Sequence, residues 1–380
     1  MHIYYIGNIR IPTEKAHGST VAKSCEALAR AGANVTLVVP RRKTQFKEDI
    51  FETYGVEKIF TVRCVPTLDL LRLSGAQWAF WGSYAVFYIF VFFALLRVPK
   101  KDAVIYTREA PLLTLSALGM PAILECHHVF AKRKLYFWLA RKAKGIVTIS
   151  AALKQAFVSA GFSDKKIIVA PSGVDLSIFA NNTTQTEARS MLGLPRERAI
   201  VVYTGNFTTM GADKGISDIL KSLKRLPDVM FVAVGGSEKD RTHYDKEAQD
   251  LGVEAQVELK GFVPQATLAL YQKAADSLLM PFPDTPHYRS NMSPVKMFEY
   301  MASGRPIITS DLPTIREVLN EKNAGLVPPG DSRALADTIR TLLSEPERGQ
   351  RLAEQAQREV LAYSWDERSK KILSFISSAW

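Results

Sequence analysis

Short β-rich runs alternate with helical stretches along this chain, and this alternation constrains the fold more than any other feature. The first series of runs is HIYYIG, NVTLVV, DAVIYT, PAILEC and GIVTIS, with helical stretches such as STVAKSCEALARAGA between them. A Pro-, Gly- and Asn-rich stretch at residues 171–184 interrupts the pattern, which restarts with AIVVYTG, VMFVAVGG, VELKG, SLLMPF and PIITSD. Strands alternating with helices form parallel sheets, so the two series predict two doubly wound α/β domains.

Length and composition agree with a globular protein of two domains. The chain has 380 residues, of which 47% are apolar and 23% are charged. Its three widely spaced cysteines (Cys25, Cys64 and Cys126) fit neither a disulfide framework nor a zinc site, which indicates a reducing compartment. The first residues, MHIYYIGNIRIP, are too short and too quickly polar for a signal peptide and are typical of a first strand. We therefore expect a cytoplasmic location.

The positive charge is concentrated in the first half of the chain. Residues 1–170 contain 24 Lys and Arg against 11 Asp and Glu, whereas the remainder contains 25 against 27. The first half is therefore expected to face an anionic partner, with a merely solvated surface as the alternative. No nucleic-acid reader motif accompanies the charge, so no nucleic-acid partner is expected.

The second half carries candidate phosphate-binding turns. In VVYTGNFTTMGADKGISDIL, a strand ends at Gly205, and Lys214 stands just before a helix, where helix N–H groups favour anions. Ordinary turn chemistry is the alternative explanation. There is neither a Walker loop nor a G-x-G-x-x-G motif, which argues against a P-loop ATPase and a typical dinucleotide enzyme.

Residues 290–311, SNMSPVKMFEYMASGRPIITSD, are the most informative stretch. A helical pattern that buries Val295, Phe298 and Met301 also carries Glu299, and Lys296 stands three residues before this carboxylate. Pro294 suits the first turn of a helix, because its missing N–H would have no partner within the helix. Taken alone, a surface glutamate on a helix is the ordinary explanation for Glu299, so the surrounding motifs must decide whether it belongs to a site.

The ordered motifs resemble the retaining GT-B glycosyltransferases of family four, also called glycosyl transferase group 1. The matching pieces are YTGN…KG, VGG, GFVP, YQKAADSLLMPF, SPVKMFEYMASGRPIITSDLPTIREVL and AGLVPPGD, with RIPTEKAHGSTVAKSCEALARAGANVTLVVPRR, VIYTRE, GIVTISAALKQAF and VAPSGVDLSIF in the first half. The resemblance implies the GT-B fold, in which two Rossmann-like domains face a central cleft. It implies an acceptor domain at residues 1–172, completed by a C-terminal helix at 364–380 that crosses back, and a donor domain at 173–363.

The resemblance also implies a site for a nucleotide diphosphate sugar. Glu299 would bind the ribose hydroxyls, since a carboxylate offers two acceptor oxygens to a vicinal diol. Backbone groups around Gly261 would contact the base, and helix-start N–H groups would meet the diphosphate. The implied donor-binding residues are Gly18, Ser19, Gly205, Asn206, Lys214, Gly261, Phe262, Val263, Ser293, Pro294, Val295, Lys296 and Glu299.

Two positions depart from the family pattern. Asn291 stands where a glutamate usually contacts the transferred sugar, and Asn206 replaces an arginine that usually follows the YTG glycine. The loss of these charges leaves Lys214 and Lys296 as the main cations for the leaving diphosphate. The resemblance implies catalytic roles for His127, Lys214 and Asn291.

The first domain is expected to bind the acceptor. His127, in LECHHVF, matches a histidine that touches the transferred sugar in family members, and a structural histidine is the alternative. The expected acceptor contacts are Lys15, His17, Arg108 and His128. The adjacent His127 and His128 point to opposite faces of an extended chain, so no metal site is expected. No cofactor is expected, and transfer would proceed with retention, assisted by the donor's own diphosphate oxygens.

An uncharged segment from Leu73 to Leu96 needs its own explanation. Nine of the nineteen residues in WAFWGSYAVFYIFVFFALL, 78–96, are aromatic, and Arg72, Arg97, Lys100 and Lys101 flank the segment. A spanning helix would divide the first domain, so burial and insertion into one anionic leaflet are the alternatives. We favour insertion, with the membrane-contacting residues Trp78, Trp81, Tyr84, Phe87 and Tyr88.

These features together predict a peripheral enzyme on the inner face of the cell membrane that glycosylates a lipid-linked acceptor in cell-surface polysaccharide or glycoconjugate synthesis. A transferase with a soluble acceptor and a catalytically silent GT-B binding subunit are the alternatives. A nucleotide-sugar epimerase of the same architecture matches the motif order less well. The donor base, with UDP and GDP as the candidates, stays open.

Overall fold

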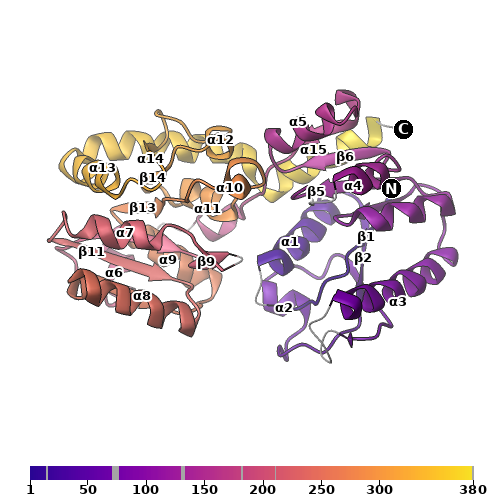
Figure 1. Ribbon diagram of the computed structural model, residues 1–380, viewed down its shortest axis with the longest axis horizontal. Helices are drawn as coiled ribbons and strands as arrows, with labels where there is room; N and C mark the ends of the chain where they lie inside the picture. Colours follow the sequence, from indigo (N-terminus) through magenta and orange to yellow (C-terminus); the bar gives the residue numbers. More distant parts are fainter. Residues whose placement is uncertain (14–15, 71–76, 130–132, 181–182, 210, 379–380) are drawn as a thin grey trace. The chain divides into compact units, whose positions relative to one another are not determined.

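The computed structural model divides into two compact units, residues 1–171 with 365–380 and residues 172–364 (Figure 1). It describes residues 1–13, 16–70, 77–129, 133–180, 183–209 and 211–378. The expected domain boundaries at 172/173 and 363/364 lie one residue from this division. Both units are α/β with parallel main sheets, which confirms the predicted fold class.

Unit 1 is built on a seven-stranded parallel sheet within the described residues, in the order β3-β2-β1-β4-β5-β6-β7. Alternate side chains of β1 enter opposite hydrophobic layers: Tyr4 and Ile6 pack with α3, α4 and α5, and Ile3 and Tyr5 pack with α1 and α15. The sheet is therefore covered on both faces, as continuous apolar strands require. Its strands are His2–Ile6 (β1), Asn34–Pro40 (β2), Thr61–Val65 (β3), Ala103–Thr107 (β4), Ala122–Cys126 (β5), Gly145–Thr148 (β6) and Ile167–Val169 (β7).

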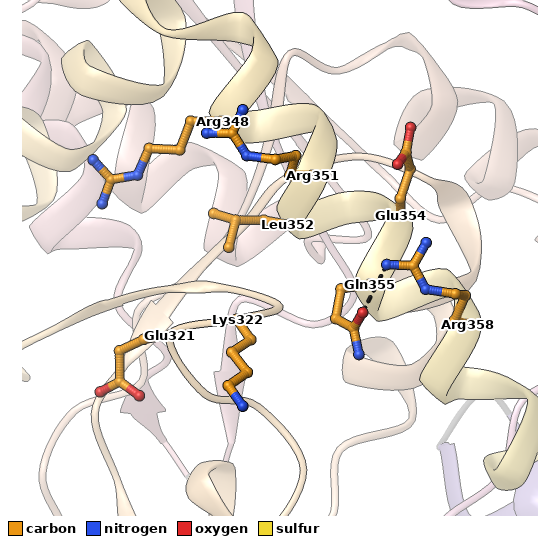
Figure 2. A pocket seen from close by; sticks show the side chains of 8 residues that line it. All are labelled: Glu321, Lys322, Arg348, Arg351, Leu352, Glu354, Gln355 and Arg358. Carbon is orange, nitrogen blue, oxygen red and sulfur yellow. Dashed lines mark hydrogen bonds between the residues drawn. The ribbon is translucent and has the colours of Figure 1, made fainter.

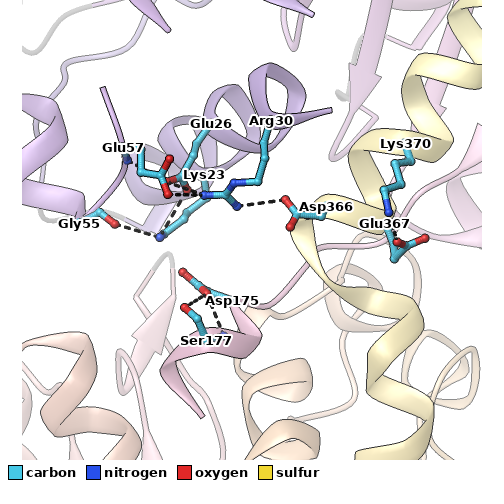
Figure 3. A network of polar contacts seen from close by, with 10 residues as sticks. All are labelled: Lys23, Glu26, Arg30, Gly55, Glu57, Asp175, Ser177, Asp366, Glu367 and Lys370. Atoms are coloured by element: carbon cyan, nitrogen blue, oxygen red, sulfur yellow. Dashed lines mark hydrogen bonds and ion pairs between the residues drawn. The ribbon is translucent and has the colours of Figure 1, made fainter. Parts of the chain in front are cut away.

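The helices of unit 1 include the last helix of the chain. They are Ala16–Arg30 (α1), Ile50–Tyr54 (α2), Gln77–Leu96 (α3), Arg133–Ala140 (α4), Ala151–Ser159 (α5) and Trp365–Ser378 (α15), with 3₁₀ turns at Ala110–Leu118 (η2) and Asp164–Lys166 (η3). Figure 3 shows how α15 is tied to α1: Arg30 lies 3.1 Å from Asp366 and 3.2 Å from Glu57. The C-terminal helix thus completes the first unit, although it follows the second unit in sequence.

Unit 2 is built on a six-stranded parallel sheet within its described residues, in the order β12-β11-β8-β13-β14-β15. Side chains of α6, α9 and α11 pack in one hydrophobic layer, and those of α7, α8 and α13 pack in the other. The strands are Ala199–Thr204 (β8), Val229–Val234 (β11), Val257–Lys260 (β12), Ser277–Met280 (β13), Ile307–Ser310 (β14) and Gly325–Val327 (β15), and a small hairpin pairs Thr208–Thr209 (β9) with Ala212–Asp213 (β10).

The helices of unit 2 lie mostly between successive strands, and α13 and α14 follow the last strand. They are Gln185–Leu192 (α6), Ile216–Leu223 (α7), Glu238–Leu251 (α8), Gln265–Ala274 (α9), Pro286–Ser290 (α10), Val295–Ser303 (α11), Pro313–Arg316 (α12), Ser332–Ser344 (α13) and Pro346–Val360 (α14), with 3₁₀ turns at Leu176–Ile178 (η4), Glu254–Gln256 (η5) and Leu361–Tyr363 (η6). Because the strands are parallel, the turns that follow β8, β11, β12 and β13 gather at one edge of the sheet.

Candidate functional site

At the carboxyl edge of the unit 2 sheet, the turns that follow β8, β11 and β12 lie close to one another, main chain against main chain. The Gly205 N–H, after β8, donates to the Val234 carbonyl at 2.7 Å, and the Gly235 N–H donates to the carbonyls of Lys260 and Gly261. Gly235 has φ of +114°, and a side chain there would stand 2.9 Å from the Gly205 carbonyl. The turns after three neighbouring strands are therefore packed main chain against main chain, which requires glycine at this edge of the sheet.

Helix α11 places Glu299 beside this edge. Its carboxylate is buried, at 7% exposure, and accepts from Gln265 Nε2 at 3.2 Å and from Gln272 Nε2 at 3.4 Å. Burial raises its pKa, although the two amides and Lys296 act in the opposite direction. Two neutral donors thus hold the carboxylate in one orientation, as expected of a group that recognises a hydroxyl pair.

Lys296 projects from the first turn of the same helix. Its amine is buried without a hydrogen-bond partner and lies 3.4 Å from the centre of the Tyr203 ring. Burial lowers its pKa well below the usual range, and the nearby Lys214 adds to this effect. No side chain caps α11 in this described segment, so the first N–H groups at Val295 and Lys296 are left for another acceptor. An amine without a hydrogen-bond partner beside an uncapped helix N-terminus is a suitable binding site for an anion.

Lys214 stands before α7, but its helix is already capped. Asp213 accepts from the N–H groups of Gly215 at 2.8 Å and Ile216 at 3.0 Å. The proposal that the start of α7 holds phosphate therefore needs correction, because a carboxylate occupies these two donors. The side chain of Lys214 stays a candidate, and burial lowers its pKa to about 8.

The other predicted donor residues differ in their surroundings. Asn206 is exposed, and its carbonyl accepts from the Tyr203 hydroxyl. Phe262 is 61% exposed and lies between Gly261 and Val263 after β12. Asn291 closes the short helix α10 through its N–H, which donates to the His287 carbonyl.

Ser293 lies in the segment that leads into α11, here called the α11 entry (residues 293–296), and hydrogen-bonds Ser172 at the start of unit 2. Its hydroxyl accepts from the Ser172 N–H at 2.8 Å, and its carbonyl accepts from the Ser172 hydroxyl at 2.7 Å. Its side chain therefore orients the chain before Pro294 at this entry. This is a positioning role that the motif alone did not indicate.

Unit 1 contains a charge cluster around Glu125 of β5, whose side chain is fully buried. Arg108 Nη2 lies 2.8 Å from Glu125 Oε1, Arg368 Nη2 of α15 lies 3.1 Å from Oε2, and the Tyr106 hydroxyl donates to Oε2. Burial alone would raise the pKa of Glu125, but the two guanidinium groups and His127 hold it well below its usual range. The carboxylate is therefore ionised and acts only as an acceptor.

His127 belongs to this cluster. Its Nε2 lies 2.6 Å from Glu125 Oε1, and 27% of its side chain is exposed. Burial and the charge of Arg108 lower its pKa to about 4. Because the carboxylate can only accept, Nε2 carries the proton, and Nδ1 is the acceptor of a neutral ring. His127 is thus built to accept from a hydroxyl rather than to attract a phosphate.

Of the other four predicted acceptor contacts, three lie in the part of the chain that the structure describes. Arg108 is held at the Glu125 cluster, and its buried Nε has no hydrogen-bond partner. His128 and His17 are exposed. Lys15 lies outside the described residues.

Gly18 and Ser19 lie in the first turn of α1, where N–H groups lack helical partners. A side chain on Gly18 would meet the Tyr54 hydroxyl at 2.1 Å. Glycine is therefore required at this position, because α1 packs directly against Tyr54.

The aromatic segment forms α3, a 20-residue helix long and apolar enough to cross a membrane by length and composition alone. Its exposed residues include Trp78 at 62% and Trp81 at 54%. Tyr84 and Phe87, predicted to contact a membrane, are instead buried in the unit 1 core, because they share the face of α3 that packs on the sheet layer. Tyr88 is half-buried, and its hydroxyl pairs with Thr114.

The sequence interpretation missed several residues of these two sites: Gln265, Gln272, Asp213, Glu125, Tyr106 and Arg368. A usable signal existed only for Glu125, a lone charge inside the apolar strand AILEC, because such a charge requires a buried partner. Among the described residues, no group of three or more His, Cys, Asp or Glu side chains is arranged to hold a metal ion.

A polar hollow on α14 is separate from these residues. Figure 2 shows it between α14 and the 321–322 turn, and Arg358 there donates to Gln355. Its lining residues are Glu321, Lys322, Arg348, Arg351, Leu352, Glu354, Gln355 and Arg358. None of them is a predicted site residue, so the hollow is not part of the candidate site.

Two protein families match successive parts of the chain. The model of the glycosyl transferases group 1 matches residues 184–359, and that of glycosyltransferase family 4 matches residues 18–178. The chain belongs to the group 1 glycosyltransferases. The group 1 model lies within unit 2, and the family 4 model covers most of unit 1 and the first residues of unit 2. Together the two models cover most of the chain.

Relatives of this chain include two named glycosyltransferases. A D-inositol 3-phosphate glycosyltransferase from Xylanimonas cellulosilytica is 29% identical over 56% of this chain and 52% of its own. A phosphatidyl-myo-inositol mannosyltransferase from Mycolicibacterium smegmatis is 29% identical over 53% of this chain and 50% of its own. The chain thus spans about half the length of these relatives. The structure of Anabaena HepE in complex with UDP-glucose has the same fold, with a TM-score of 0.75, 18% identity and 100% coverage of both chains.

Proposed function

We propose that this group 1 protein transfers a sugar from a nucleotide diphosphate sugar, with UDP or GDP as the carrier, to an acceptor hydroxyl with retention of anomeric configuration. The observation that carries the proposal is the α11 entry, where the buried Glu299 and the unpartnered Lys296 amine lie one turn apart on one helix. The carboxylate suits the ribose diol, and the amine with the helix start suits a diphosphate.

The chemistry assigned to the chain is positioning and charge stabilisation. Lys296, Lys214 and the α11 N-terminus would stabilise the charge that develops on the departing diphosphate, without a bound metal. His127, with its acceptor nitrogen, would bind a hydroxyl of the transferred sugar. The diphosphate itself would take the proton of the attacking hydroxyl, so no side chain is assigned as general base.

Binding and transfer are tested separately. Calorimetry with UDP, GDP and ADP identifies the carrier, and the matching nucleotide sugars are then assayed for transfer. Binding of one nucleotide diphosphate with release of its sugar to an acceptor supports the proposal, and NMR of the product gives the anomeric configuration. Activity that survives EDTA supports the metal-free mechanism. A protein that binds none of the three nucleotides would contradict the proposal, whereas binding without transfer would favour a silent binding subunit.

We further propose that the acceptor is lipid-linked and that the protein acts at the inner face of the cell membrane. The support is the solvent-facing side of α3, where Trp78, Trp81, Phe80, Ile89, Phe90, Phe93 and Leu96 are exposed. The opposite side of α3 is packed in the core, so the helix would lie in the interface rather than span it. The name of the mycobacterial relative, which acts on a phosphatidyl-myo-inositol, agrees with a lipid acceptor.

Helix α4 adds a second apolar and basic surface in unit 1. Leu135 and Trp138 are 54% and 59% exposed, and Lys134, Arg141 and Lys142 are exposed around them. Lys142 Nζ lies 5.6 Å from the Trp138 ring centre. Tryptophan favours the headgroup region, and each basic residue near an anionic surface contributes about 1 kcal/mol.

Sedimentation with phosphatidylglycerol vesicles tests the membrane proposal. Wild-type protein should pellet at low salt, bind less as salt rises, and stay in solution when Trp78, Trp81 and Phe93 are changed to serine. Met191→Ser is the matched control, because Met191 is 67% exposed in unit 2. Equal binding of the triple variant and the control would contradict the role of α3. If the protein does not bind vesicles and transfers sugar efficiently to a soluble acceptor, the alternative of a transferase with a soluble acceptor is favoured.

A further inference from the structure

The Lys296 amine has an environment that an ammonium ion does not tolerate without a ligand. It is buried with no hydrogen-bond partner, and the centres of the Tyr203 and Phe282 rings lie 3.4 Å and 5.9 Å from it. Aromatic faces attract a cation weakly, but they accept no hydrogen bond of ordinary strength. Three potential N–H donors of one side chain therefore stand without acceptors.

The amine also lies against the turn that ends β8. A side chain at Gly205 would stand 3.3 Å from Lys296 Cε and 3.4 Å from Nζ, and the glycine itself has φ of +100°. The Lys296 amine thus lies at the carboxyl edge of the sheet, where the turn after β8 approaches the uncapped start of α11. This is the place in unit 2 where an anionic ligand would meet both kinds of donor.

The titratable groups that face Lys296 come from each element around it. Tyr203 of β8 is neutral, because burial raises its pKa well above the usual value. Lys214, before α7, is a second cation that acts on Lys296. Glu299 of α11 is the one carboxylate that acts on Lys296 in this described region, and its oxygens are bound by glutamine amides rather than by the lysine.

We propose that Lys296 takes up a proton when a nucleotide diphosphate binds, so that an amine without a partner in the empty site becomes a charged donor to the diphosphate. The proposal rests on the proposed function and goes beyond it, because it makes donor affinity depend on pH through one residue. The balance is simple: the proton comes from solvent and ends on Nζ, and no bond of the nucleotide is broken.

The sign of the effect follows from the two states. In the empty site, burial and the neighbouring Lys214 depress the pKa of Lys296, whereas two phosphate charges raise it when the ligand binds. The bound state then holds more protons than the free state, so diphosphate affinity falls as pH rises above neutrality. Lys214, with a pKa of about 8, contributes a smaller uptake of the same sign.

Calorimetry in buffers of different ionisation enthalpy measures this uptake directly. At pH 7.5 in PIPES, HEPES and Tris, the apparent enthalpy of UDP binding, or of GDP binding if GDP is the carrier, should vary with the ionisation enthalpy of the buffer, with a slope that shows net proton uptake. The corresponding nucleoside, which has no phosphate, should bind with no slope. The pH is kept above 7 so that the diphosphate is already fully ionised.

Two variants locate the proton. Lys296→Met should reduce the slope to the residual uptake of Lys214 and weaken diphosphate binding at least tenfold, with nucleoside affinity unchanged. Lys296→Arg should retain diphosphate binding but lose the slope in the same way, because a guanidinium cannot be deprotonated. Near-UV circular dichroism checks that both variants fold.

The outcomes separate this inference from the proposed function. Diphosphate binding with no slope in wild type, or with an equal slope in Lys296→Arg, would overturn the inference and leave the transferase proposal intact. Failure of all three nucleotide diphosphates to bind would overturn the transferase proposal itself. A wild-type slope that both variants reduce would establish Lys296 as the proton-accepting group.

Discussion

Acidification should destabilise unit 1 through a single histidine. His127 donates to the ionised Glu125 from Nε2, and burial and Arg108 lower its pKa from 6.5 to about 4. Between these two pH values the unfolded chain binds a proton that the folded unit excludes. Stability contributed by the neutral ring is therefore fully present above pH 6.5 and is lost as pH falls toward 4.

The size of the effect follows from the pKa difference. Each unit corresponds to about 1.4 kcal/mol, so protonation of His127 in the unfolded chain should remove about 3 kcal/mol of unfolding free energy by pH 4. Glu125 does not obscure this window. Its pKa is depressed when folded, so its own contribution is lost only as pH falls below the ordinary carboxyl value of 4.5.

The chain offers a selective probe for this measurement. All five tryptophans, Trp78, Trp81, Trp138, Trp365 and Trp380, belong to the residue ranges of unit 1. Urea unfolding followed by tryptophan fluorescence between pH 4.5 and 7.5 therefore reports on unit 1, and each transition gives its free energy of unfolding.

His127→Gln is the test variant, because a glutamine amide can donate to Glu125 but does not titrate. The advantage of wild type over this variant should shrink by about 2–3 kcal/mol between pH 7 and pH 4.5. His243→Gln, at an exposed position of α8 in unit 2, is the control and should run parallel to wild type, because the tryptophan signal reports on unit 1. Parallel curves for wild type and His127→Gln would refute the reasoning.

Three further outcomes are expected. Glu299→Gln should weaken nucleotide binding by about 1–3 kcal/mol in calorimetry without loss of fold, since it removes a charged acceptor, and an unchanged affinity would place the ribose elsewhere. Lys214→Ala should weaken UDP binding more than uridine binding, and an equal loss would separate Lys214 from the phosphates. Arg368→Met should cost about 3–5 kcal/mol of unfolding free energy, because it leaves Glu125 buried beside fewer cations. The exposed-pair control Arg316→Ala should cost less than about 1 kcal/mol, and similar costs would contradict the account of the cluster.

The sequence predicted the central strands but not three edge strands. β1, β4 and β8 are continuous apolar runs, because both of their faces are buried. β3, β7 and β15 are edge strands of three to five residues. Pairing with one neighbouring strand defines these three segments, and propensity alone did not identify them, although VELKG predicted the fourth edge strand of the main sheets, β12.

The two candidate sites also differed in how far the sequence predicted them. Glu299 and Lys296 lie in one contiguous motif, so their proximity followed from helical spacing. The Glu125 cluster joins β4, β5 and α15, and no local pattern links Arg368 to a strand so far away in the sequence. On α3, nearly uniform apolarity hid which side faces the core, so Tyr84 and Phe87 were assigned to the wrong surface.

The position of α15 has a consequence for biosynthesis. A ribosome completes residues 172–364, the whole of unit 2, before it makes the helix that supplies Arg368 to Glu125. During that interval unit 1 holds a buried carboxylate with one of its two guanidinium partners missing, and α1 covers its face of the sheet without α15. The N-terminal half of the nascent chain therefore reaches its native state last, which reverses the usual order of co-translational folding.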